Sequence, residues 1–128
     1  MQHFDTPRGF FESALKVRQE TLGKDHPDTL MTLNNLADLL YVTERYDEAE
    51  PLYRQALETS QQVLGDKHPD TLMTMNNLAM LLNATNRAEK AKTLSQEAVK
   101  EATQILGSDH PYTKNFSEVL KEIFTNLR

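Results

Sequence analysis

Three histidines, His26, His68 and His110, carry the side chains best suited to chemistry, and Asp28 and Asp70 follow the first two at a spacing of two residues. Imidazole and carboxylate groups bind zinc and also act as general acids and bases. The histidines, however, recur at a fixed interval of 42 residues (68 − 26 and 110 − 68). If stacked helix pairs cause that interval, equivalent histidines lie roughly 20 Å apart, whereas each zinc ligand lies about 2 Å from its ion. We therefore predict that the histidines cap helices or order loops and bind no metal.

Other catalytic arrangements are missing from the sequence. An active site needs a nucleophile with a base, paired carboxylates in a pocket, or a glycine-rich phosphate loop. The chain has no cysteine and only four glycines, and three of these, Gly23, Gly65 and Gly107, are placed to end helices. Charges over residues 44–58 and 87–101 alternate in sign, which is typical of a solvated helix face. We expect no enzyme activity and no cofactor.

The composition narrows the class of protein further. The 128 residues are 38% hydrophobic and 26% charged, and no apolar run approaches the roughly 20 residues that cross a bilayer. Residues 1–5 lack the basic and then apolar pattern of a signal peptide. We therefore expect a cytoplasmic protein that does not bind membranes. The formal net charge of −5 argues against a nucleic-acid partner, which would need a basic surface.

An internal repeat organises almost the whole chain. Residues 22–32 return as 64–74 and, less completely, as 106–113, and fifteen of the twenty positions in 22–41 are identical in 64–83. We predict one array without a linker. Its parts are a helix that corresponds to the second half of a repeat and is unpaired (1–21), a first repeat (22–63), a second repeat (64–105) and a C-terminal capping helix (106–128).

Each repeat reads as two helices. Apolar residues recur at three- and four-residue spacing from Leu30 to Leu40 and again from Ala49 to Leu64, which predicts two amphipathic helices. Proline after each histidine suits the first position of a helix. Alanines, among them Ala37 and Ala56, mark where two helices approach most closely.

The residue pattern of the two helices resembles the tetratricopeptide repeat, in the 42-residue version found in kinesin light chains. The matching motifs are Leu33-x-x-Leu36-Ala37-x-x-Leu40 and Tyr46-x-x-Ala49-x-x-x-Tyr53-x-x-Ala56. The resemblance implies an all-α solenoid, a right-handed superhelix of antiparallel helix pairs, with about six helices here. It also implies a non-catalytic scaffold whose concave groove, lined by first helices, binds a peptide or a partner segment.

The resemblance assigns the groove to ten residues on the two first helices, namely Met31, Asn34, Asn35, Asp38, Tyr41, Met73, Asn76, Asn77, Met80 and Asn83. An asparagine amide can both donate to and accept from the backbone of an extended peptide, and methionine offers an adaptable apolar surface. The alternative is that one asparagine of each pair only ties a loop or a neighbouring helix.

The charges of the first helices narrow the expected ligand. Neither 27–44 nor 69–86 contains lysine or arginine, so we do not expect the carboxylate clamp that basic residues provide. Only Lys114 and Lys121 could add positive charge, near the C-terminal end. A neutral or apolar extended segment of a protein or peptide is the favoured partner.

The two ends of the array differ from its centre. No first helix precedes residues 10–22, and Pro7 stands where alanine is expected, so we expect that helix to begin near Gly9. Phe4, Phe10 and Phe11 would then be partly exposed, and an uncovered aromatic patch usually marks an interface. A homodimer through the N-terminal helix is therefore one alternative function, and a regulatory repeat portion of a larger signalling protein is another.

At the C-terminal end, Lys121 replaces the Ala79 of the preceding repeat. A lysine in that place indicates that no further helix packs there. We expect the last helix to turn Leu120, Ile123 and Phe124 inward and to act as a solvating cap.

Overall fold

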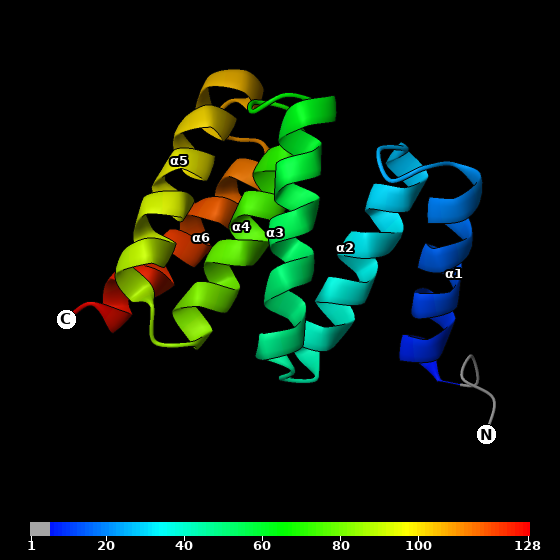
Figure 1. The fold of residues 1–128 in the computed structure, drawn as a ribbon. Helices are drawn as coiled ribbons and strands as arrows, with labels where there is room; N and C mark the ends of the chain where they lie inside the picture. The colour runs from blue at the N-terminus through cyan, green and yellow to red at the C-terminus, as the bar shows by residue number, and fades with distance from the viewer. Residues whose placement is uncertain (1–5) are drawn as a thin grey trace. The chain divides into compact units, whose positions relative to one another are not determined.

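The computed structural model describes residues 6–128, and its regular elements in that range are six α-helices (Figure 1). They are α1 (Pro7–Thr21), α2 (Pro27–Val42), α3 (Tyr46–Val63), α4 (Pro69–Ala84), α5 (Ala88–Leu106) and α6 (Pro111–Asn126). The prediction of an all-α fold with about six helices is confirmed. The chain forms two compact units, one ending at Val63 and the other running from Leu64 to Arg128. The boundary falls where the second 42-residue repeat begins.

The three histidines cap helices, as predicted. The Nδ1 atom of His26 accepts a hydrogen bond of 3.1 Å from the backbone N–H of Asp28, and His68 and His110 make the same bond at 3.0 Å. Each histidine has extended backbone angles and is followed by proline at the start of its helix. A side-chain acceptor at this place satisfies a backbone donor that has no partner within the helix.

In the first unit, α2 packs against both α1 and α3. Its buried face is formed by Leu30, Leu33, Leu36, Ala37 and Leu40. From α3, Ala49, Tyr53 and Ala56 are buried against it. The alanines have no exposed surface, which is the close helix approach that the sequence predicted.

The start of α1 corrects one expectation. The helix begins at Pro7 and not near Gly9. The Thr6 hydroxyl accepts a hydrogen bond of 2.9 Å from the backbone N–H of Gly9. A threonine cap followed by proline is a favourable helix start, because proline has no N–H that needs a partner.

In the second unit, α4 packs against both α5 and α6. On α6, Phe116, Val119 and Ile123 are buried, whereas Leu120 is half-buried and Phe124 is exposed. The expectation that Phe124 turns inward is therefore wrong. A helix turns about 100° per residue, so Phe124 lies off the face that Phe116, Val119 and Ile123 share.

Replacing Ala37 by leucine is expected to destabilise the first unit by about 1–3 kcal/mol, because extra atoms at a fully buried contact force the helices apart. Ala84→Leu adds the same atoms at the exposed end of α4 and serves as the control. Urea unfolding followed by circular dichroism measures both variants. Equal midpoints for Ala37→Leu and the unchanged chain would disprove close packing at this position.

Candidate functional site

The exposed side of α2 carries three of the five groove residues predicted on that helix. Met31, Asn35 and Asp38 lie on it together with Asp28 and Val42. Their spacing of three and four residues places them on one helix face, which we call the α2 outer face. Met31 is 53% exposed and Val42 is 70% exposed. Asp28 and Val42 were not among the groove residues predicted from the sequence, although the same spacing indicates them.

The other two predicted residues of α2, Asn34 and Tyr41, lie half-buried at the edge of this face. The Asn34 Oδ1 atom is buried and has no hydrogen-bond partner among the described residues. The Tyr41 ring packs against Tyr46 of α3, with ring centroids 5.4 Å apart. These residues therefore border the α2 outer face and contribute less surface to it.

A buried hydroxyl holds the one carboxylate near the middle of this face. Tyr53 of α3 is almost fully buried, and its hydroxyl donates a hydrogen bond to Oδ1 of Asp38. Burial raises the pKa of Asp38, and the Tyr53 hydroxyl acts in the opposite direction. Burial also raises the pKa of Tyr53, and the hydrogen bond to Asp38 adds to that rise. From the sequence, Tyr53 was identified only as a residue of the repeat motif.

On α4, two of the predicted groove asparagines connect helices. Asn76 is only 1% exposed, and its amide nitrogen lies 3.4 Å from the Oδ1 of Asn115 on α6. The Oδ1 of Asn83 accepts a hydrogen bond of 2.8 Å from Asn126, also on α6. Asn76 therefore follows the alternative in which it ties a neighbouring helix. The remaining predicted groove residues of α4, Met73, Asn77 and Met80, are half-buried.

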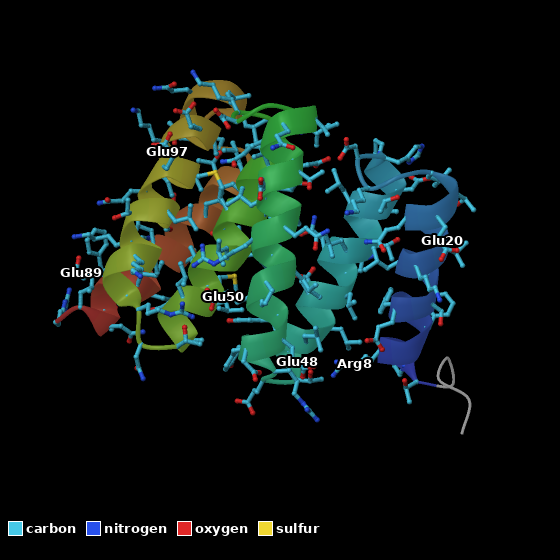
Figure 2. The ribbon with its side chains drawn as sticks, in the orientation of Figure 1. Arg8, Glu20, Glu48, Glu50, Glu89 and Glu97 are labelled. Atoms are coloured by element: carbon cyan, nitrogen blue, oxygen red, sulfur yellow. The ribbon has the colours of Figure 1, made fainter. Side chains whose placement is uncertain are left out.

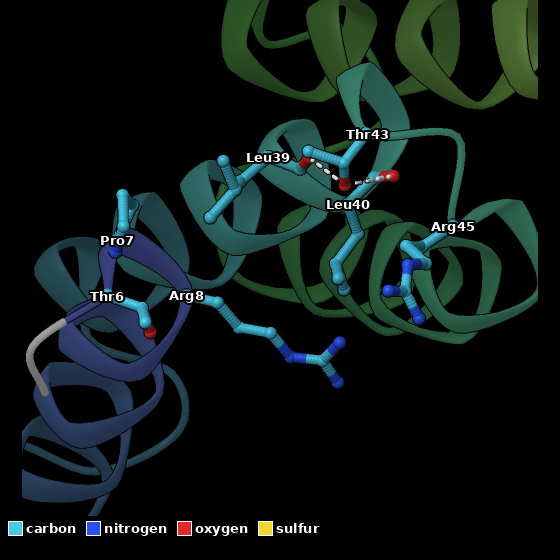
Figure 3. Close-up of a pocket in the computed structure, with 7 residues that line it drawn as sticks. All are labelled: Thr6, Pro7, Arg8, Leu39, Leu40, Thr43 and Arg45. Atoms are coloured by element: carbon cyan, nitrogen blue, oxygen red, sulfur yellow. Dashed lines mark hydrogen bonds between the residues drawn. The ribbon is translucent and has the colours of Figure 1, made fainter. Parts of the chain in front are cut away.

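A hollow of about 260 Å³ lies in the first unit, where the start of α1 meets the end of α2 (Figure 3). It is lined by Thr6, Pro7, Arg8, Leu39, Leu40, Thr43 and Arg45. The Thr43 hydroxyl is occupied, since it bonds the carbonyl oxygens of Leu39 and Leu40 at 2.8 and 3.2 Å. This hollow, which we call the Arg8 hollow, was not predicted from the sequence.

The charges around the Arg8 hollow are paired. Arg8 of α1 donates two hydrogen bonds to the carboxylate of Glu48 on α3, and these side chains lie together in Figure 2. The Nε atom of Arg8 also lies 3.6 Å from Oε2 of Glu12, and Nη1 of Arg45 lies 3.7 Å from Oε2 of Glu48. Hydrogen bonding to Arg8 lowers the pKa of Glu48. Two arginines and two glutamates leave no net positive charge for an anionic ligand.

The outer side of α1 exposes large apolar side chains. Phe10 is 59% exposed and Val17 is 55% exposed, and their seven-residue spacing places them on one face. Phe11 is half-buried, and its ring centroid lies 5.7 Å from that of Phe10. Phe4 lies outside the described residues. We call Phe10 and Val17 the α1 outer face.

Among residues 6–128, no three His, Cys, Asp or Glu side chains are grouped so that they could hold a metal ion. No helix in the same range has the length and apolar character needed to cross a membrane.

Paired helices with capped starts and a repeat of 42 residues define a helical repeat protein of the α-solenoid class. The model of the tetratricopeptide repeat family matches residues 8–58 and 28–100. The chain belongs to this family. No curated protein matches it significantly in sequence.

Solved structures with the same fold include two with which the chain superimposes over almost its whole length. The crystal structure of BtubC (BKLC) from P. vanneervenii superimposes with a TM-score of 0.86 at 23% identity, covering 97% of this chain and 50% of that one. A putative kinesin light chain of Podosopora anserina, with nearly identical TPR-like repeats, gives 0.76 at 22% identity, covering 94% and 57%. The chain therefore spans about half the length of these structures, and the likeness at such identities is one of fold.

Replacing Glu48 by glutamine is expected to remove a pH-dependent part of the stability. Because the folded state lowers the pKa of Glu48 below its ordinary value of 4.5, the stabilisation is present above that value and is lost as the pH falls through the lowered pKa. The variant should unfold more easily than the unchanged chain at neutral pH, and the two should converge in acid.

Urea unfolding at a series of pH values measures this difference. Glu20→Gln, at the exposed C-terminal end of α1 (Figure 2), is the control. A difference between Glu48→Gln and the unchanged chain that persists undiminished into acid would contradict the assigned role of the Arg8–Glu48 pair.

Proposed function

We propose that this chain is a non-catalytic interaction module that binds a segment of a partner protein on the α2 outer face. Tetratricopeptide repeats generally bind protein partners, and the chain belongs to that family. The observation that carries the proposal is the exposure of Met31 and Val42 beside Asn35 and Asp38 on a helix whose leucines are buried in contact with α1 and α3. Apolar surface next to polar side chains is typical of binding sites that fix a ligand's orientation.

The partner segment is held by apolar contact and through its backbone. Met31 and Val42 provide the apolar surface, and the Asn35 amide provides both a donor and an acceptor. The absence of lysine and arginine from 27–44 argues against a strongly acidic segment. Asn76 was also predicted to bind a ligand, but it is buried and bonds α6. The proposal therefore relies on the exposed amide of Asn35.

A photo-crosslinking residue in place of Met31 is expected to capture a partner protein from native lysate. The matched control places the same residue at Gln55, which is exposed on α3 in the same unit. Mass spectrometry identifies the captured proteins. Equal capture at positions 31 and 55, or capture of the chain itself only, would contradict binding on the α2 outer face.

Self-association through the α1 outer face is the second candidate function. It is supported by the exposure of Phe10 and Val17 on one side of α1, since large apolar side chains exposed together usually mark an interface. The interface would be isologous, with the same patch on both copies, as in most homodimers.

Phe10→Ser/Val17→Ser is expected to shift a dimer towards monomer, because it removes the apolar contact between copies. Size-exclusion chromatography with light scattering over a range of concentrations measures the mass. Phe124→Ser removes an exposed phenylalanine from α6 and is the control. A mass equal to one chain at every concentration would dismiss self-association.

A further inference from the structure

The α2 outer face has the residue spacing of a helix that packs lengthwise against another helix. It carries four exposed residues at intervals of four, three and four positions, namely Met31, Asn35, Asp38 and Val42. This alternation of three and four keeps side chains on one seam along a helix, as in a coiled coil. The face therefore fits a second helix that runs along it.

The order of the residues along this seam makes the face its own complement. If two copies of α2 lie antiparallel with Met31 beside Val42 of the second copy, a step of four positions along each helix brings Asn35 beside Asp38. Two-fold symmetry repeats both contacts. Apolar side chains then meet at both ends of the seam and polar side chains meet in its middle, so the same patch serves both copies, as in most homodimers.

The charges of α2 favour the antiparallel over the parallel arrangement. Asp28 and Asp38 are its only charged residues, and a parallel two-fold pair would place each beside its own copy, where like charges repel. In the antiparallel pair, Asp38 lies beside an amide that donates hydrogen bonds. Asp28 then lies at the end of the second copy's α2, which Arg45 follows with a side chain that is 63% exposed.

These contacts leave the bonds within each copy in place. Asp38 accepts a hydrogen bond from Tyr53 of its own chain, and a carboxylate accepts several hydrogen bonds. Arg45 lies close to Glu48 of its own chain, and a guanidinium group has five N–H donors. The pair therefore does not require either side chain to give up its interactions within the chain.

We propose that two copies of this chain pair through their α2 outer faces, antiparallel, with Met31 of each copy beside Val42 of the other. The contact is small, so the pair forms at high protein concentration. It uses other side chains than self-association through the α1 outer face. The pairing does not rest on the proposed function, and a partner segment on the same face would compete with it.

Disulfide crosslinking tests the pair, because the chain has no cysteine of its own. Met31→Cys and Val42→Cys chains are mixed in equal amounts and oxidised mildly, and the products are separated without reductant. A disulfide needs Cα atoms within about 7 Å of each other. The proposed pair brings position 31 of one copy beside position 42 of the other, but it holds the two copies of position 31 about 16 Å apart along the helix axis.

The mixture should give a disulfide-linked dimer, and neither variant alone should do so. Val42→Cys mixed with Gln55→Cys, which is exposed on α3, measures crosslinking by random collision. We expect the first mixture to exceed this control several-fold. Mass spectrometry establishes that the disulfide joins positions 31 and 42, and circular dichroism establishes that the variants fold.

Three outcomes would overturn the proposal. The first is a yield no higher than that of the Gln55→Cys control. The second is an equal yield from Met31→Cys alone, which would indicate a parallel pair. The third is loss of the disulfide when Phe10→Ser/Val17→Ser is added to both chains, which would assign the pairing to the α1 outer face. A failure of the proposed function is distinguished from these, because capture at position 31 detects proteins other than the chain itself.

Discussion

Close contact between helices through alanine is the interaction on which both units depend. Ala37 of α2 and Ala56 of α3 have no exposed surface in the first unit, nor have Ala79 of α4 and Ala98 of α5 in the second. Small side chains let the backbones approach, so the leucines around them reach the opposite helix and are buried. The same contact fixes the rotation of each helix about its axis. It therefore decides that Met31 and Asp38 of α2 face outward.

The elements that sequence could predict are those set by short-range physics. A stripe of leucines and alanines specifies an amphipathic helix, and a histidine before proline specifies its start, because the bond from His26 to Asp28 spans two residues. The predictions that were wrong concern longer or competing interactions. Thr6 provides a helix start that the repeat pattern does not contain. Asn76 is buried, and its amide bonds Asn115, a residue 39 positions away that the repeat does not reproduce.

The proposed binding surface was likewise only partly predictable from the sequence. Helical spacing placed Met31, Asn35 and Asp38 on one face, and the structure shows them there. The bond between Tyr53 and Asp38 joins two helices across 15 positions, and the Arg8–Glu48 pair joins two helices across 40. Neither interaction leaves a periodic signal, because each depends on how two helices are placed. The first of them touches a carboxylate of the proposed surface, which spacing alone cannot reveal.

Near-identical first helices present different surfaces because of what packs beside them. Within the second unit α6 lies against α4, and Asn115 and Asn126 of α6 form hydrogen bonds with Asn76 and Asn83 of α4. Within the first unit α2 packs against α1 and α3, and Met31 and Asn35 remain exposed. Repeat position alone therefore does not assign a binding role. Where the repeats also differ in side chains, as Asp38 differs from Met80, the difference falls on the α2 outer face, where a change can alter the surface without disturbing the alanine contacts that hold the fold.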